Sequence, residues 1–260
     1  MERGGRRRGG PTAMMERWLP AAASDHARAL DAVLFSVHAH MALIFILWLS
    51  VFVIALIRFR RGANPAPRQE GVGGLWPAIA IGIVIAGDVI ILGALALPAW
   101  ADRNQPPPAG IAPVEVRVTA EQFAWNIHYP GPDRVFGRTT PQSISATNPI
   151  GIDRADPAAA DDVGIQNVLM LPVNRTAVIQ LTSRDVIHSF TLNEMRVKQD
   201  ATPGMTARVW FTPIVTGQWE IACSQLCGLG HYRMRGAYQV VDEAAWERWL
   251  ADQRSILSPR

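Results

Sequence analysis

A short segment near the end of the chain carries four side chains of the kind that bind soft metal ions. It reads CSQLCGLGHYRM and contains Cys223, Cys227, His231 and Met234. Thiolate, thioether and imidazole ligands together select copper among the biological metals, and one cysteine with two histidines and a weak methionine is the pattern of blue-copper sites. The segment therefore indicates a copper site.

Two cysteines in the segment, rather than one, favour a site with two ions. A spacing of four lets both sulfurs turn toward one point on a loop and bridge two coppers. Each ion is then capped by one histidine, His231 from the loop and the distant His188. We expect Met234 as a weak axial ligand on one ion and the backbone carbonyl of Gln225 as an oxygen donor to the other.

Other uses of these residues stay open at this point. Two cysteines and two histidines also suit a tetrahedral zinc site, and in an exported domain Cys223 and Cys227 could form a disulfide. A lone histidine is more often an ordinary surface or core residue than a ligand. However, zinc has no use for Met234, and a disulfide has no use for His188 or His231.

The rest of the chain provides a membrane anchor for this site. Of its 260 residues 49% are hydrophobic, and the net charge of +3 gives no indication of a nucleic-acid partner. Residues 37–57 and 75–100 are apolar runs long enough to cross a bilayer as helices. Asp88 lies inside the second run, where it should face a partner protein, a neighbouring helix or a water-filled path.

The arginines indicate the orientation of this hairpin. Arg58, Arg60, Arg61 and Arg68 crowd the loop between the two apolar runs, which the positive-inside rule assigns to the cytoplasm. We therefore expect the large C-terminal part on the outer, periplasmic side of a bacterial cell membrane. Residues 1–35 are expected to form a flexible arm, and a true start at Met14 would remove its first arginines.

The outer part reads as a β-domain. Residues 101–112 form a proline-rich linker, and from Val114 apolar and polar residues alternate. Similar stretches separated by Pro, Gly and Asn turns predict an antiparallel sandwich or barrel over residues 113–241. Residues 133–164 read as a long surface loop or insertion, and residues 242–260 as a closing helix and tail.

With these features in hand, the chain resembles subunit II of the haem–copper oxidases, the cytochrome c oxidase type that carries the dinuclear copper A centre. The resemblance covers roughly residues 37–241. Its motifs follow in order: two membrane helices, the aromatic stretch QFAWNIHY, then LTSRDVIHSF, RVKQDATPG and the copper loop.

The resemblance implies an all-β cupredoxin-like Greek-key barrel preceded by two transmembrane helices. It implies that His188 is the first copper ligand and that no catalytic residue for oxygen reduction lies in this chain. The expected function is to accept electrons from cytochrome c or a similar periplasmic donor and pass them to haem in subunit I. That subunit reduces oxygen to water and pumps protons, and other oxidase subunits are further expected partners. No C-x-x-C-H motif for a fused haem c occurs in these residues.

The chain departs from the family pattern in two places. Gln225 stands where the family usually has a glutamate that helps to bind magnesium at the boundary with subunit I, so magnesium binding is in doubt. Phe123 stands where many relatives have the tryptophan that receives electrons, so electrons could pass through Phe123 or Trp125. Both could equally be packing residues.

Three charged residues bear on the other contacts of the family. Lys198 and Asp200 match a motif that faces subunit I, and an interface salt bridge is their expected use. Glu70 lies six residues before Trp76 rather than the three usual for a family glutamate near a proton channel, so that role is not transferred. A rival hypothesis is a membrane-anchored copper-binding or carrier protein outside any oxidase, which would need no such interface.

Overall fold

The structure is a computed structural model that describes residues 18–63, 71, 73–108 and 110–257 of the chain. Two compact units divide it. Residues 28–105 form one, and the described residues up to Ala27 together with those from Pro106 onward form the other. The predicted fold class, a β-sandwich preceded by two apolar helices, is confirmed.

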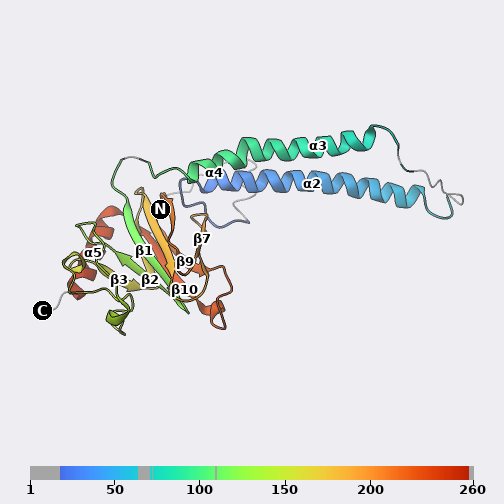
Figure 1. The fold of residues 1–260 in the computed structure, drawn as a ribbon. Coiled ribbons are helices and arrows are strands. Elements are labelled where there is room, and N and C mark those ends of the chain that lie inside the picture. Colours follow the sequence, from blue (N-terminus) through green and yellow to red (C-terminus); the bar gives the residue numbers. More distant parts are fainter. Residues whose placement is uncertain (1–17, 64–70, 72, 109, 258–260) are drawn as a thin grey trace, which may run out of the picture. The chain divides into compact units, whose positions relative to one another are not determined.

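The first unit is a helical hairpin. It contains α2 (Ala27–Arg58), α3 (Trp76–Ile91), a five-residue π-helix η1 (Leu92–Ala96) and α4 (Leu97–Arg103). Figure 1 shows α2 and α3 side by side. Both Ala27–Arg58 and Trp76–Arg103 are long and apolar enough to cross a membrane. Their side chains are largely exposed, as expected for a surface that lipid or another membrane protein covers.

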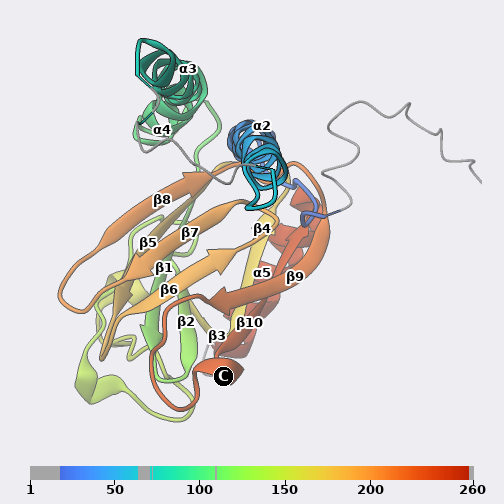
Figure 2. The ribbon, with the colours of Figure 1, turned by 90° about the vertical axis from the view of Figure 1, so that its right-hand side faces the viewer.

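The second unit is a sandwich of two five-stranded sheets. One sheet has the order β3-β2-β1-β5-β8 and the other β4-β10-β9-β6-β7, and Figure 2 shows β8, β5 and β1 in one layer with β7 and β6 in the other. The first sheet comprises β1 (Val114–Glu121), β2 (Ala124–Tyr129), β3 (Val163–Gln166), β5 (Ala177–Ser183) and β8 (Ala207–Phe211). The second comprises β4 (Val168–Pro172), β6 (His188–Leu192), β7 (Val197–Ala201), β9 (Gly217–Cys223) and β10 (Arg235–Val241).

Alternating apolar residues form the core between the sheets. In β1 every second residue is buried, because successive side chains of a strand point to opposite faces. The largest fully buried side chains include Trp125, Tyr129, Phe190 and Tyr238. Full burial of such a side chain stabilises the fold by about 1.5–3 kcal/mol.

Strand direction differs in part from the prediction. The alternation predicted antiparallel pairing, but β1 pairs parallel to β5 and β4 pairs parallel to β10. The remaining neighbours within the two sheets are antiparallel. A period of two reports only which face of a strand is buried. Direction follows from how the connections cross between the sheets.

The stretch 133–164 is an insertion folded onto the first sheet rather than a bare loop. It contains two short helices, η2 (Pro141–Ser143) and η3 (Pro157–Ala159), and its own small apolar cluster. Near its end Asp162 is fully buried and accepts a hydrogen bond from His128 at 2.6 Å and one from the Gly137 N–H at 2.8 Å. Phe136 packs against the His128 ring, with the ring centroids 5.1 Å apart.

The predicted closing helix is α5 (Glu243–Leu257). Trp246 and Leu250 are buried on the face that meets the sandwich. The Trp246 ring lies 5.5 Å from that of Tyr129 at the end of β2. Aromatic pairs of this kind contribute about 0.5–1.5 kcal/mol beyond the area that they bury.

The predicted flexible arm over residues 1–35 differs from the structure in its second half. Residues 1–17, with Met14, lie outside the described residues. Ala23 and Ser24 are fully buried against the sandwich, and the Ala23 N–H donates to the Glu194 carbonyl at 2.9 Å while Ser24 Oγ donates to the Met195 carbonyl at 2.8 Å. These contacts join residues far apart in sequence, so no local sequence pattern predicts them.

Two other predicted boundaries also shift. Helix α2 begins at Ala27, nine residues before the predicted hairpin 36–100. Helix α4 continues to Arg103, inside the predicted linker 101–112. Pro98 is tolerated there because it occupies the first turn of α4.

Candidate metal centre

The candidate ligands meet at one end of the sandwich. His188 is the first residue of β6, Cys223 is the last residue of β9, and Met234 immediately precedes β10. Strands β6 and β9 are paired so that Phe190 lies opposite Cys223. This register brings His188 beside the loop that joins β9 to β10, although the sequence separates them by more than thirty residues.

Their ligand atoms form a compact cluster. Cys227 Sγ lies 3.9 Å from Cys223 Sγ, 3.7 Å from Met234 Sδ and 3.6 Å from His231 Nδ1. His188 Nδ1 is 3.1 Å from Met234 Sδ. One atom each from His188, Cys223 and Cys227 can be chosen so that all three lie within 4.8 Å of one another. Both cysteines are free thiols.

A backbone oxygen completes the donor set. The carbonyl of Gln225 lies 3.3 Å from Cys223 Sγ, whereas the Gln225 side chain is exposed. The structure therefore brings together every residue that the sequence proposed as a ligand. Three sulfurs, two imidazole nitrogens and one carbonyl oxygen are available to a soft cation.

Burial makes the centre of this cluster dry. His188 is fully buried, and Cys227 and Met234 are 4% and 1% exposed. Burial and the neighbouring Cys223 raise the pKa of the Cys227 thiol to about 11, so without a cation this sulfur is protonated. A thiolate there needs a positive partner.

Asp185 orients the His188 ring, and sequence reasoning missed it. Its Oδ1 accepts a hydrogen bond from His188 Nε2 at 2.8 Å, which leaves Nδ1 facing the sulfurs. Partial burial alone would raise the pKa of Asp185, but hydrogen bonds from His188 and from the N–H groups of Gln122 and Val186 outweigh it and lower that pKa. The available signal was a carboxylate three residues before a candidate ligand.

Gln122 braces the same site and was also missed. Its side-chain Nε2 donates to the Cys227 carbonyl at 2.6 Å, and its backbone N–H donates to Asp185 Oδ2 at 2.7 Å. One residue thus connects the loop that carries the cysteines to the carboxylate that orients His188. In the sequence analysis Gln122 appeared only as the first residue of the aromatic stretch QFAWNIHY.

The two aromatic candidates for electron transfer occupy different places. Trp125 is fully buried, with its ring 6.2 Å from that of His188 and 5.4 Å from that of Phe190. It therefore cannot touch an external donor. Phe123 is half-buried and packs against the loop, where a Cβ on Gly230 would lie 2.6 Å from its Cε2 atom.

The loop itself presents apolar side chains to the outside. Leu226, Leu229 and Tyr232 are 77%, 99% and 76% exposed, and each stands next to a candidate ligand or within three residues of one. Large exposed apolar side chains close together on one loop make it a candidate interaction surface. The Arg233 guanidinium lies 5.8 Å from the centre of the Phe123 ring, at the edge of this surface.

Lys198 and Asp200 lie on β7, at the edge of the second sheet. Both are exposed and share one face of the strand, since they are two residues apart. Asp200 is paired in register with Ser189, next to His188. Within the described part of the chain, neither side chain has a hydrogen-bond or ion-pair partner.

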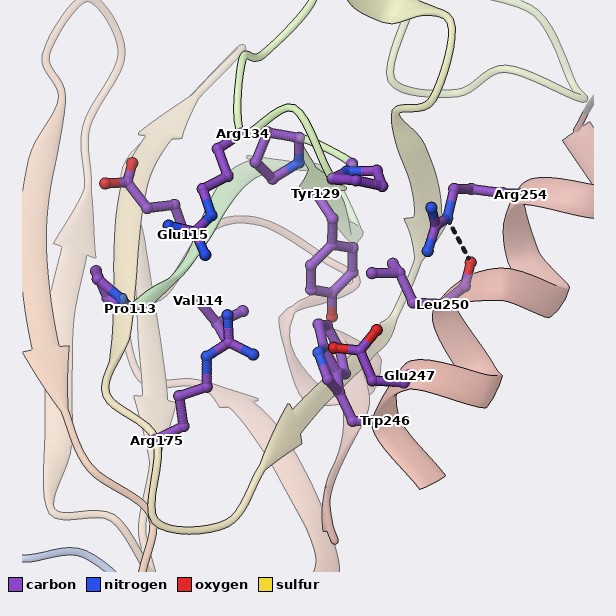
Figure 3. A pocket seen from close by; sticks show the side chains of 13 residues that line it. Pro113, Val114, Glu115, Tyr129, Arg134, Arg175, Trp246, Glu247, Leu250 and Arg254 are labelled. Carbon is purple, nitrogen blue, oxygen red and sulfur yellow. Dashed lines mark hydrogen bonds between the residues drawn. The ribbon is translucent and has the colours of Figure 1, made fainter. Parts of the chain in front are cut away.

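A separate cleft of about 300 Å³ opens beside Val114, the first residue of β1. Val114 lies about 23 Å along the strand from Glu121, the end of β1 that leads to Gln122 and the metal centre. Figure 3 shows Tyr129 at its centre with Arg134, Arg175 and Arg254 around it. Arg175 is held by Glu243 at 2.7 Å. The lining contains no thiol or imidazole, so this cleft is unsuited to a soft metal. Glu70, the other functional candidate, lies outside the described residues.

Comparisons with known proteins agree with this architecture. A family model described as "Cytochrome C oxidase subunit II, periplasmic domain" matches residues 114–241. The chain is 31% identical over 234 residues to cytochrome c oxidase subunit 2 of Cereibacter sphaeroides, covering 82% of this chain and 73% of that one. It is 38% identical over 143 residues to alternative cytochrome c oxidase subunit 2 of Bradyrhizobium diazoefficiens.

The match to the Bradyrhizobium diazoefficiens protein covers 55% of this chain and 52% of that relative, so the chain spans about half the length of that relative. Among solved structures, the periplasmic domain of subunit II of cytochrome oxidase from Bradyrhizobium japonicum is 27% identical. It covers 58% of this chain and all of that domain, with a TM-score of 0.43.

Proposed function

This chain belongs to the cytochrome c oxidase subunit II family, and from that premise we propose that it is the electron-accepting subunit of a proton-pumping haem–copper oxidase. In this proposal it takes electrons from a c-type cytochrome or similar periplasmic donor. It passes them to haem in subunit I, where oxygen is reduced to water. The observation that carries the proposal is the convergence of two cysteines, two histidines and a methionine on one buried point.

The donor set fits a dinuclear copper A centre. His188, Cys223, Cys227, His231 and Met234 would hold the two ions with the carbonyl of Gln225. When bound, such a centre supplies a one-electron carrier whose charge is shared over two metals. The chain's own contribution is to bury the sulfurs of Cys227 and Met234, to exclude water from them and to fix the ring of His188 through Asp185.

The alternatives left open by the sequence fit the geometry less well. A zinc site would leave Met234 Sδ unused, although it lies 3.1 Å from His188 Nδ1 inside the cluster. A disulfide would give no use to the two imidazoles directed at the cysteines. Soft, mixed sulfur and nitrogen donors favour copper over zinc.

Electrons are proposed to arrive over the exposed loop rather than through Trp125. Leu226, Leu229 and Tyr232 offer an apolar surface to a donor, and Phe123 packs directly beneath that loop. Trp125 is buried behind His188 and can act only as part of the dry lining. Strong electrostatic steering of the donor is not required by this arrangement.

Contact with subunit I is proposed at the β7 edge. Lys198 and Asp200 are exposed and lack partners within the described part of the chain. Asp200 is paired with Ser189, the residue after His188, and Lys198 with Thr191, two positions further along β6. Ion pairs with subunit I would use both residues. The rival, a copper carrier outside an oxidase, has no use for this edge or for a pair of cysteines that would bridge two ions permanently. Magnesium at that boundary stays a proposal, since the exposed Gln225 amide is a weaker ligand than a carboxylate.

The test is the electron-paramagnetic spectrum of the full-length chain in detergent after copper loading. The proposal expects the signal of one unpaired electron shared by two coppers, and loss of that delocalised signal in Cys227→Ser. A spectrum of a single copper ion in the parent chain would contradict the proposal. Co-purification of a haem-bearing subunit in mild detergent separates the oxidase from the carrier.

A further inference from the structure

A histidine and an aspartate face each other inside the membrane hairpin. His40 Nε2 of α2 lies 3.2 Å from Asp88 Oδ1 of α3. Gly87 makes this approach possible, because a Cβ there would lie 2.9 Å from His40 Nε2 and closer still to the ring carbon beside it. Asp88 is the one acidic or basic side chain in residues 75–100.

Asp88 lies deep in the span. At 1.5 Å per residue, it is about 18 Å from Trp76 and about 22 Å from Arg103. The hydrocarbon core of a bilayer is about 30 Å thick, and the aspartate side chain is too short to reach either interface from that depth. Its carboxylate must therefore find polar partners at its own level.

His40 covers only part of this need. Its side chain is 17% exposed in the hairpin, whereas that of Asp88 is 66% exposed. His40 Nε2 makes no hydrogen bond to any described residue, so its approach to the carboxylate gives Asp88 no directed hydrogen bond. A carboxylate has about four acceptor positions, and most of those on Asp88 face away from the hairpin.

Lipid tails supply no donors to the exposed carboxylate. Phospholipid headgroups carry negative phosphate and lie at the interface, so they match neither its charge nor its depth. A membrane-spanning helix with a hydrogen-bond-donating side chain matches both. The π-helix η1 begins at Leu92, one turn beyond Asp88, and single π-turns occur frequently at functional sites.

We propose that Asp88 is the docking point of this hairpin on a transmembrane helix of another oxidase subunit, which presents a hydrogen-bond donor or cation to the carboxylate. His40 and Gly87 hold the carboxylate in place from the opposite side. The identity of the partner rests on the proposed function. The polar contact itself rests on the exposure of the Asp88 carboxylate and on the depth of this pair in the span.

The experiment uses the full-length chain co-expressed with the oxidase subunits and purified in mild detergent. Asp88→Leu removes the carboxylate, and because leucine is far more apolar, the helix inserts at least as well as before. Asp88→Asn keeps a carbonyl acceptor of the same shape. Ser50→Ala is the matched control, since Ser50 is also a polar residue in the span but its hydroxyl already bonds to Ile46 O at 2.7 Å within its own helix.

Each preparation is diluted in detergent, and the concentration at which the partner subunit separates is measured. If the contact has the strength of an ordinary intramembrane hydrogen bond, the Asp88→Leu complex should dissociate at a concentration about three- to thirty-fold higher than the parent complex does. Asp88→Asn should lie between Asp88→Leu and the parent chain, and Ser50→Ala should match the parent. The copper spectrum should be the same in all four.

Equal separation of Asp88→Leu and the parent chain would overturn the docking proposal. So would an Asp88→Leu complex that holds together but no longer pumps protons, because that result assigns Asp88 to a water-filled path. A parent chain that binds no membrane subunit overturns it as well. Absence of the dinuclear copper spectrum in the copper-loaded parent chain would instead contradict the proposed copper function. The dilution series would still decide the role of Asp88.

Discussion

His188 and Asp185 form a hydrogen bond that decides which side of the imidazole faces the sulfurs. Nε2 lies 2.8 Å from Asp185 Oδ1, and Nδ1 on the other side of the ring lies 3.1 Å from Met234 Sδ. Ligand histidines commonly donate their second N–H to such a carboxylate, which fixes the ring and strengthens its binding. Asp185 is thus a positioning residue for the centre.

Replacement of Asp185 tests this relationship. Asp185→Ala should weaken copper binding by about 10–100-fold, and Asp185→Asn should recover part of the loss because its carbonyl can still accept from Nε2. Affinity is measured by competition with a copper chelator. Asp200→Ala, an exposed carboxylate on β7, is the control and should bind copper as the parent does. Equal affinity in Asp185→Ala would show that the ring is held by packing alone.

Gly230 tests the contact between the metal loop and the aromatic stretch. Its φ of −92° suits any residue, so the obstacle to a side chain is the Phe123 ring, whose Cε2 atom would lie 2.6 Å from a Cβ. Gly230→Ala should cost about 1–3 kcal/mol through overpacking and shift the copper spectrum. The double variant with Phe123→Leu should recover most of both effects. Additive losses in unfolding and spectral measurements would refute the contact.

Asp162 tests the anchoring of the insertion. Its buried carboxylate accepts hydrogen bonds from His128 and from the Gly137 N–H, and its removal leaves both buried donors unpaired, so Asp162→Ala should destabilise the domain by about 1–3 kcal/mol in urea unfolding. Asp153→Ala is a matched control, since that residue pairs with Arg138 at the same 2.6 Å but on the exposed surface, where such pairs contribute little. Similar unfolding midpoints for the two variants would show that burial of the pair is not what stabilises the insertion.

Leu229 tests the donor surface. Because it is 99% exposed, Leu229→Gln should leave folding and the copper spectrum unchanged. Loss of an apolar contact at the centre of a docking surface should raise KM for a reduced c-type cytochrome by about fivefold or more, with kcat unchanged. Val135→Gln, on the insertion and also exposed, should have no effect. An unchanged KM for Leu229→Gln would place the donor elsewhere.

The amino-acid sequence alone was enough to predict the candidate ligands, the two apolar spans and the presence of a β-domain. These features are local. The spacing of Cys223 and Cys227 indicates a metal site, and the length of an apolar run indicates a membrane span. The alternation of apolar and polar residues indicates a strand such as β1. His188 lies far from the loop in sequence, and the resemblance to known proteins supported its choice as a ligand.

Tertiary structure decided what depends on long-range register. The pairing of β6 with β9 sets His188 beside the loop, and the parallel pairing of β1 with β5 brings Gln122 within reach of both Asp185 and Cys227. Burial of Trp125 and the approach of His40 to Asp88 have the same origin. Each requires two segments distant in sequence to meet, and side-chain periodicity carries no information about which segments these are.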